Sequence, residues 1–363
     1  MDNVFDFRNR LINEYSSFSR SFSKVSAQDI LSKVELEYDR GRYWPEPLIQ
    51  INPNYKRQST VQQLAHEGML HASCSHIFQT GKTEGRAADL HLYVHQLQAL
   101  AKAQKQQSYV VTTGTGSGKS LAFFVPIIDR ILKAKQADPQ KRTRAIVIYP
   151  MNALANSQLE ELDKFLHGYP DDQKPFTVAR YTGQESDADR KQIADNPPDI
   201  LLTNFMMLEL ILTRFEDVDR RVVEHCQGLE FLVLDELHTY RGRQGADVAL
   251  LVRRLRERLQ ASQLVCIGTS ATMSSTGTQA DRNQTVANVA SLLFGAQITE
   301  HDVIGETLER VTNPAKDIEA VKSLLKPALL KESYHWPDFA AFSDDPLAVW
   351  VELSLGIELP LDE

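Results

Sequence analysis

The chain has 363 residues, a net charge of −8, and 42% hydrophobic and 24% charged residues, which is the balance of an ordinary globular protein. The acidic net charge excludes a surface that attracts nucleic acid over its whole area. The three cysteines have no paired spacing, no signal-peptide pattern opens the chain, and no apolar stretch is long enough to cross a membrane. We therefore expect a cytoplasmic protein without membrane contact, and the length predicts two or three domains.

Residues 1–90 predict a mostly helical accessory region. An extended segment at 44–53 interrupts it, since its prolines cannot continue a helix. The aromatic side chains and prolines of this segment favour packing on the domain that follows.

Between residues 91 and 277, apolar runs typical of strands alternate with stretches typical of helices. This alternation predicts an α/β fold, with a mostly parallel sheet that helices cover on both faces. After a polar linker at 274–278, the chain from 278 to 363 predicts a helical tail that begins a following domain. The expected strands lie near residues 109–112, 144–149, 176–181, 199–203, 229–234 and 263–269.

A glycine-rich segment, Thr113–Ser120, follows the first of these strands and leads into a helix-forming stretch. Glycines let successive backbone N–H groups turn toward phosphate oxygens, and the positive end of the next helix adds to the attraction. Lys119 can neutralise the β- and γ-phosphates of a nucleotide, and the Ser120 hydroxyl can hold Mg²⁺. A glycine-rich turn with a surface lysine is the alternative, because Thr113 replaces the first glycine of the strict pattern. The expected nucleotide-binding residues are Thr113, Gly114, Thr115, Gly116, Ser117, Gly118, Lys119 and Ser120.

Two acids follow another buried strand. Asp235 and Glu236 come directly after the apolar run Phe231–Leu234, and His238 lies two residues further on. Open α/β sheets bind ligands at the carboxyl ends of their strands. There Asp235 can hold the Mg²⁺ that bridges nucleotide phosphates, and Glu236 can orient and deprotonate the attacking water. A helix cap is the alternative for an acid pair in isolation. The expected catalytic group is Lys119, Asp235, Glu236 and His238.

With a third buried strand ending in Ser270-Ala271-Thr272, the chain resembles the superfamily 2 helicases. Thr113–Ser120 resembles their motif I, whose first position is commonly a small residue other than glycine. Asp235–His238 resembles motif II of the DEAD/DEAH kind, and Ser270–Thr272 matches motif III. The resemblance implies a RecA-like P-loop NTPase lobe that binds ATP and Mg²⁺. Three shorter segments resemble motif Ia, the TG element and motif Ib, namely 149–158, Thr182-Gly183 and 199–204.

The same resemblance implies contacts with the phosphates of a nucleic-acid strand, without reading of its sequence. Ser270 and Thr272 would couple the nucleotide state to the strand through hydrogen bonds to motif II. The stretch 92–100 resembles the Q-motif region, in which Gln96 would read the adenine edge with one donor and one acceptor. An amphipathic helix with incidental glutamines is the alternative there. The expected strand contacts are Pro150, Asn152, Thr182, Gly183, Thr203 and Asn204.

Two further phrases, at 153–155 and 238–245, resemble bacterial helicases with a DUF1998 region, including mitomycin-repair helicases and the DrmA-type helicase of DISARM phage defence. This narrower resemblance implies DNA as the partner and a role beside defence or repair proteins. The segment at 44–53 could then meet DNA in place of packing. A helix expected at 245–259 carries Arg253, Arg254, Arg256 and Arg258, which favour a solvated face with Glu257 as an intrahelical partner.

Superfamily 2 motors hydrolyse ATP between two RecA-like lobes, and no segment after residue 273 resembles the second lobe. We therefore expect the N-terminal part of a larger helicase, which binds nucleotide but turns it over slowly when isolated. A double-stranded-DNA translocase that does not separate strands is one alternative. A scaffold that binds ATP only to dock a defence or repair partner is the other.

Overall fold

The computed structural model describes residues 3–22, 25–41, 44, 54–114, 116–271, 278–331 and 335–356. Thr115, Thr272, most of the polar linker and most of the segment at 44–53 lie outside these ranges.

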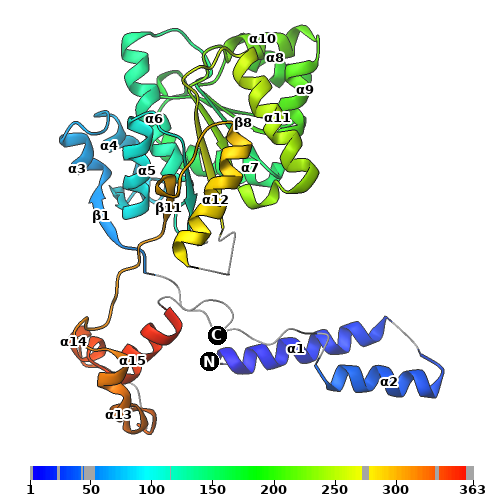
Figure 1. Ribbon diagram of the computed structural model, residues 1–363, viewed down its shortest axis with the longest axis vertical. Coiled ribbons are helices and arrows are strands. Elements are labelled where there is room, and N and C mark those ends of the chain that lie inside the picture. Colours follow the sequence, from blue (N-terminus) through cyan, green and yellow to red (C-terminus); the bar gives the residue numbers. More distant parts are fainter. Residues whose placement is uncertain are drawn as a thin grey trace.

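A seven-stranded sheet forms the centre of the fold, with the order β11-β5-β10-β9-β6-β8-β7 (Figure 1). Every strand pairing within it is parallel. The strands are β5 (Tyr109–Thr112), β6 (Ala145–Tyr149), β7 (Val178–Tyr181), β8 (Ile200–Asn204), β9 (Phe231–Leu234), β10 (Val265–Ser270) and β11 (Val303–Gly305). The predicted α/β fold is confirmed, and the six expected strands are present with ends that differ by at most two residues.

Helices cover both faces of this sheet, and each face has its own hydrophobic cluster. Successive side chains of a strand point to opposite faces, so Tyr109 and Val111 pack in one cluster while Val110 packs in the other. A strand that is buried on both faces must be apolar throughout, as β9 is. The first cluster contains α5 (Val94–Gln104), α6 (Leu121–Ala137) and α7 (Asn152–Leu166), and the second contains α8 (Asp187–Asp195), α9 (Phe205–Thr213), α10 (Asp217–His225), α11 (Gly242–Arg258) and α12 (Gln279–Phe294).

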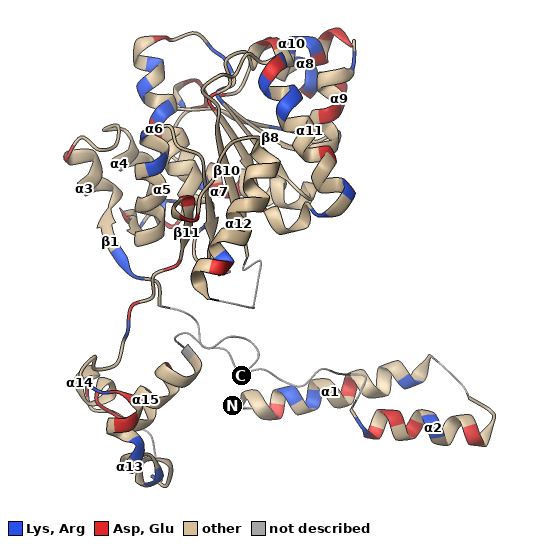
Figure 2. Ribbon diagram, in the orientation of Figure 1, with Lys and Arg blue, Asp and Glu red and all other residues tan. Residues whose placement is uncertain are grey.

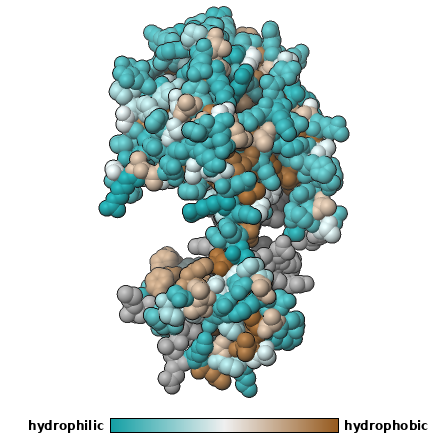
Figure 3. All heavy atoms as spheres, turned by 90° about the vertical axis from the view of Figure 1, so that its left-hand side faces the viewer, coloured by the Kyte–Doolittle hydropathy of each residue, from teal (hydrophilic) through white to brown (hydrophobic). Residues whose placement is uncertain are grey.

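The surface over these helices is polar and mixed in charge. Lys and Arg alternate with Asp and Glu along α8 and α10 (Figure 2). The side of the sheet domain that faces the viewer in Figure 3 is mostly hydrophilic. None of the described helices is both long and apolar enough to span a membrane.

The sheet domain begins well before residue 90, where the boundary of the N-terminal region was predicted. The helices α1 (Val4–Ser21) and α2 (Gln28–Asp39) contact each other, and the Tyr38 hydroxyl donates to Ser19 Oγ at 3.0 Å. Residues 55–90, in contrast, share the core of the sheet domain, because Val61, Leu70 and Phe78 pack in the same cluster as α5 and α6. The elements of this part are β1 (Arg57–Thr60), α3 (Val61–His66), α4 (Cys74–Ile77), β2 (Gln79–Thr80), η1 (Lys82–Glu84), β3 (Ala88–Asp89) and β4 (His91–Tyr93).

The sheet domain extends beyond the boundary predicted at 277, because α12 packs in its second cluster and β11 pairs with β5. The strand β11 pairs with β5 and forms an edge of the sheet. It has only three residues, which is too short for a periodicity argument to detect. The helices that follow are α13 (Ile318–Leu329), α14 (Phe339–Ser343), α15 (Pro346–Val351) and the π-helix η5 (Glu352–Gly356).

Chain entry to the sheet domain and chain exit from it lie side by side. The backbone N–H of Lys56 donates to the carbonyl of Thr307 at 2.8 Å, and the N–H of Glu309 donates to the carbonyl of Asn54 at 2.8 Å. Tyr55 and Leu308 form the antiparallel bridge between these two contacts. The segments before β1 and after β11 are therefore tied to each other.

Gly268 in β10 is packed too closely to carry a side chain. A Cβ atom there would lie 2.9 Å from Leu237 Cγ and 3.1 Å from Phe294 Cζ. We predict that Gly268→Ala lowers the free energy of unfolding by about 1–3 kcal/mol, the usual cost of overpacking a core. Urea denaturation measures this loss. Gly305→Ala is the matched control, since no atom lies within 4 Å of its added carbon, and equal losses in the two variants would contradict the packing argument.

Candidate nucleotide and nucleic-acid site

The predicted motifs lie together at the carboxyl edge of the sheet. Motif I follows β5, motif Ia follows β6, the TG element follows β7 and motif II follows β9. Motif Ib and motif III occupy the ends of β8 and β10. Because all strands of the sheet are parallel, these six segments meet at one edge, which is where open α/β sheets bind ligands.

The lysine of the glycine-rich loop is hydrogen-bonded to the backbone of the same loop. Lys119 Nζ donates to the carbonyl of Thr113 at 2.9 Å, and the hydroxyls of Thr113 and Ser117 are 2.6 Å apart. Gly116 and Gly118 have φ angles of 80° and 67°, which side chains rarely adopt. Ser120 precedes the first turn of α6, so the positive end of that helix faces the loop. A bound nucleotide phosphate would replace the Thr113 carbonyl as the partner of Lys119 Nζ.

Gln96 braces this loop from α5. Its Oε1 accepts from the Tyr93 backbone N–H at 2.9 Å, and its Nε2 donates to the carbonyl of Gly118 at 2.8 Å. Both polar groups of the carboxamide are therefore used by the protein, and the adenine-reading role stays a prediction. His95 assists from the same helix, since its Nε2 lies 3.0 Å from the Ser117 carbonyl. Burial lowers the pKa of His95, which favours a neutral ring that donates to that carbonyl.

Tyr55, where the chain enters the sheet domain, and Glu306, where it leaves, lie next to Gly114 of the glycine-rich loop. Glu306, directly after β11, accepts from the Gly114 backbone N–H at 2.8 Å. A Cβ atom on Gly114 would lie 3.0 Å from the Tyr55 hydroxyl and 3.4 Å from Glu306 Oε2. Burial and the charge of Glu306 raise the pKa of Tyr55. Neither residue belongs to a recognisable motif, so sequence reasoning missed both.

Motif II is held by Thr269, which sequence reasoning also missed. The Thr269 hydroxyl donates to Asp235 Oδ1 and accepts from the Glu236 backbone N–H at 3.2 Å. Burial, and then the charge of Glu236, raise the pKa of Asp235, while the hydrogen bond from Thr269 opposes the rise. Sequence reasoning chose Ser270 and Thr272 for this contact with motif II. Ser270 does contact motif II, since its hydroxyl lies 3.3 Å from His238 Nδ1, and Thr272 is outside the described residues.

Glu236 adopts an unusual backbone conformation. Its φ is 52°, in the left-handed region, which costs a non-glycine residue roughly 1–2 kcal/mol. The carboxylate lies 3.2 Å from His238 Nδ1. Strained backbone of this kind clusters at functional sites, where the surrounding structure holds it in place. Here the contacts from Thr269 and His238 hold Glu236 from both sides.

The expected strand contacts form a second group at the same edge. Asn204 Nδ2 donates to Asn152 Oδ1 at 2.7 Å and to the Thr182 carbonyl at 3.1 Å. Asn204 also caps α9 by accepting from the Met207 N–H at 2.7 Å. Thr203 does not fit the direct phosphate contact predicted for it, because it is fully buried and its hydroxyl donates to the Tyr181 carbonyl. Pro150 is half-buried at the end of β6.

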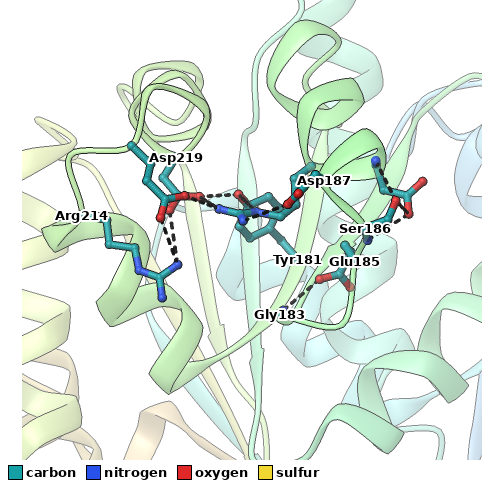
Figure 4. Close-up of polar contacts among 10 residues, drawn as sticks. Tyr181, Gly183, Glu185, Ser186, Asp187, Arg214 and Asp219 are labelled. Carbon is teal, nitrogen blue, oxygen red and sulfur yellow. Dashed lines mark hydrogen bonds and ion pairs between the residues drawn. The ribbon is translucent and has the colours of Figure 1, made fainter.

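The TG element carries an internal carboxylate that sequence reasoning missed. Glu185 Oε2 accepts from the backbone N–H groups of Thr182 and Gly183 at 2.7 and 2.9 Å, and Figure 4 shows the side chain turned toward this loop. Its Oε1 accepts from the Thr182 hydroxyl at 2.9 Å and from Arg180 Nε at 2.8 Å. The neighbouring Asp219 is fully buried and paired with Arg190 at 2.9 Å.

The arginine-rich helix α11 is anchored to its neighbours. Arg253 donates to the Leu292 carbonyl at 3.2 Å, Arg256 donates to the Phe294 carbonyl at 3.1 Å, and Arg254 pairs with Glu209. These partners replace the intrahelical contact that was predicted with Glu257. Arg256 thereby joins α11 to α12.

The family model described as DEAD/DEAH box helicase matches residues 93–280, which is more than half of the chain. The chain belongs to the DEAD/DEAH box helicase family. It therefore carries the motor domain of an ATP-dependent superfamily 2 helicase.

Individual relatives agree with this family. The uncharacterized ATP-dependent helicase YprA of Bacillus subtilis is 35% identical over 185 residues, covering 50% of this chain and 23% of that protein. Druantia protein DruE of Escherichia coli is 26% identical over 293 residues, covering 50% of this chain and 16% of that protein. The chain thus spans about a quarter or less of these curated relatives. The DUF1998 helicase MrfA bound to DNA and AMPPNP shares the fold, with a TM-score of 0.53 at 21% identity over 81% of this chain and 39% of MrfA.

Removing the Thr269 hydroxyl should weaken nucleotide binding. Thr269→Val keeps the side-chain shape but leaves the Asp235 carboxylate and the Glu236 N–H without this partner. An unpaired buried polar group costs about 1–3 kcal/mol, so we predict that affinity for an ATP analogue with Mg²⁺ falls about tenfold. Titration of a fluorescent ATP analogue measures the change. Thr269→Ser keeps the hydroxyl and should bind as the wild type does, and equal binding by Thr269→Val would contradict the bridging role.

Proposed function

We propose that this chain is the first motor lobe of a larger helicase, which binds ATP with Mg²⁺ and uses its hydrolysis to move along and unwind DNA. The observation that carries the proposal is the meeting of six motif segments at one edge of a parallel sheet. The protein acts in the cytoplasm, in DNA repair or phage defence, beside other proteins of that pathway.

The nucleotide side of this edge is suited to a triphosphate. Lys119 neutralises the β- and γ-phosphates, and the amides of the glycine-rich loop hold their oxygens. The Ser120 hydroxyl and the Asp235 carboxylate are oxygen ligands, which Mg²⁺ prefers. Ser120 and Asp235 would hold the ion, which would supply positive charge beside the nucleotide phosphates. Burial of Asp235 raises its pKa, so this ligand is charged only above its shifted pKa.

Glu236 acts on the attacking water. One of its carboxylate oxygens accepts a proton from the water as the water oxygen bonds to the γ-phosphorus. The bond from that phosphorus to the β–γ bridging oxygen then breaks, and ADP leaves. Its Oε2 is buried and lies 3.2 Å from His238 Nδ1. The contact with His238 at 3.2 Å orients the carboxylate. Glu236 is thereby assigned to turnover and Lys119 to binding.

The strand side lies at the ends of β6, β8 and β7, next to the nucleotide side at the ends of β5, β10 and β9. Asn152, Asn204 and the TG element hold phosphates of the strand backbone without reading bases. We assign the coupling of nucleotide state to the strand to Thr269 and Ser270, which contact motif II from the end of β10. We assign the accessory role to the helices α1 and α2, and the motor role to the sheet domain that reaches from Tyr55 through β11.

Strand displacement by the complete protein tests the proposal. ATP-dependent separation of a DNA duplex is the expected result. Displacement of a third strand from a triplex without duplex separation would identify a double-stranded-DNA translocase. ATP turnover that DNA does not stimulate would favour a scaffold that docks a partner protein.

Lys119→Ala should weaken ATP binding by tenfold or more, because a charge-assisted contact contributes about 1.5–3 kcal/mol. Titration of this chain with a fluorescent ATP analogue measures the loss. Lys105→Ala is the control, since that exposed lysine lies at the opposite end of α5 from the loop. Equal affinities for the two variants would remove the loop from its assigned role.

Glu236→Gln should separate binding from chemistry. In the complete protein we expect this variant to keep its affinity for ATP and to lose about 10²–10⁴-fold in turnover, the usual contribution of a general base. Steady-state ATPase rates measure the loss, and Glu319→Gln on α13 is an exposed control. Wild-type turnover by Glu236→Gln would show that another group activates the water.

A further inference from the structure

We propose that Glu185 is the resident anion of a phosphate-binding nest, and that a strand phosphate binds there by displacing its carboxylate. The nest consists of the backbone N–H groups of Thr182 and Gly183, the Thr182 hydroxyl and Arg180 Nε. The proposal rests on the proposed function, because it concerns the strand site assigned to this edge. It adds a residue that sets how tightly the lobe holds nucleic acid.

The donors around Glu185 form a complete anion site. Two consecutive N–H groups, one hydroxyl and one guanidinium converge on its two carboxylate oxygens at 2.7–2.9 Å. Consecutive N–H groups in a turn with a left-handed residue make a concave site for anions, and Gly183 supplies that residue with a φ of 88°. Phosphate oxygens use the same kinds of donor. The hydrogen-bond donors of the nest therefore suit a phosphate as well as a carboxylate.

Glu185 is charged in the nest. Burial alone would raise its pKa, but hydrogen bonds from Thr182 and Arg180 outweigh burial and lower the pKa. The side chain is 5% exposed. At neutral pH Glu185 is therefore charged and neutralises Arg180, so an arriving phosphate meets no net positive charge until the carboxylate moves away.

The nest opens toward the strand side. Gly183 is exposed, and the nearest atom that a side chain at that position would meet is Met207 Sδ at 3.6 Å. The Thr182 carbonyl accepts from Asn204 Nδ2, so the nest adjoins the asparagine pair already assigned to the strand. A phosphate that touches Asn204 is thus close to the donors that Glu185 holds.

Glu185 can move without unfolding the loop. The next residue, Ser186, caps α8, and its N–H and hydroxyl both contact Asp189 Oδ2, at 3.2 and 2.6 Å. On the other side, β7 is held in the sheet by β8. These contacts fix the backbone before and after Glu185, so that rotation of the side chain alone exchanges one anion for another.

The exchange has a signature in salt dependence. The logarithm of the binding constant for a single strand falls linearly with the logarithm of the salt concentration. Each phosphate that meets a cationic site makes the slope steeper by about 0.7. While Glu185 neutralises Arg180, a phosphate at this nest adds little to the slope. Glu185→Gln removes the resident charge but keeps the shape. We expect it to bind a fluorescent single-stranded oligonucleotide about three- to tenfold more tightly than the wild type, with a slope steeper by about 0.7.

Asp187→Asn is the matched control. Asp187 is two residues away, fully exposed, and paired only at 3.7 Å with Arg190, so its loss reports the general effect of removing one negative charge. It should raise affinity less than Glu185→Gln and leave the slope unchanged. Fluorescence anisotropy at several salt concentrations measures all three proteins. Glu185→Asp, whose shorter side chain reaches fewer donors, should give an intermediate result, and thermal unfolding confirms that each variant is folded.

Weaker or unchanged strand binding by folded Glu185→Gln would overturn the inference and make Glu185 a brace of the loop. Equal tightening by Glu185→Gln and Asp187→Asn would also overturn it, because the effect would then be long-range. These results leave the proposed function intact as long as the wild type binds the oligonucleotide. Absence of binding by every variant at low salt would overturn the strand site itself, and the inference with it.

Discussion

A parallel sheet that is buried on both faces leaves only its strand ends for polar chemistry, and this constraint organises the whole motor domain. Alternate residues of β5 enter different hydrophobic clusters, so a polar group on either face needs a partner within the protein, as the Tyr109 hydroxyl has in the Ala122 carbonyl. The first polar side chains therefore appear where the strands stop, as Asp235 does after β9. Because the pairings are parallel, these ends lie at a common edge. The segments to which we assign nucleotide and strand contacts meet there as a consequence of packing.

At that edge, the binding groups already have partners within the protein. Lys119 contacts the Thr113 carbonyl, Glu306 contacts the Gly114 amide, and Glu185 fills the nest of the TG element. Such internal partners keep the loops in shape, because unpaired polar groups would be costly to bury. They also mean that a ligand exchanges one set of hydrogen bonds for another. The net affinity for a ligand is then the free energy of its hydrogen bonds minus that of the internal hydrogen bonds that it replaces. A small change in the ligand or in the internal partner therefore shifts the affinity.

The sequence was most informative where a pattern is local. The apolar runs located six strands, since strands buried on both faces are apolar throughout. The glycine-rich loop and the acid pair fall where strand-end chemistry predicts them. Contacts between distant segments left no local signal. Thr269 bridges residues 33 and 34 positions away, Glu306 reaches a loop 192 positions away, and β11 is recognisable only through its pairing with β5.

Thr203 illustrates a different limit of sequence reasoning. The side chain of a polar residue at the end of a strand can point toward a ligand or back into the protein. Its position in the sequence does not distinguish these two cases. The structure buries Thr203 and pairs its hydroxyl with the backbone of β7. Asn204, one residue later, faces the Asn152 side chain instead. The alternation of a strand therefore decides which of two adjacent polar residues is available.

The pairing of the chain entry with the chain exit makes the sheet domain an insertable unit. Asn54 and Glu309 are 255 positions apart in sequence but are joined by hydrogen bonds, so everything between them leaves and returns at one point. Units with adjacent ends can be placed inside longer chains with little disturbance to either part. Tyr55 and Glu306 stand at this junction and also contact Gly114. Whatever is attached at either end is therefore tethered beside the glycine-rich loop, because both connections begin at residues next to Gly114.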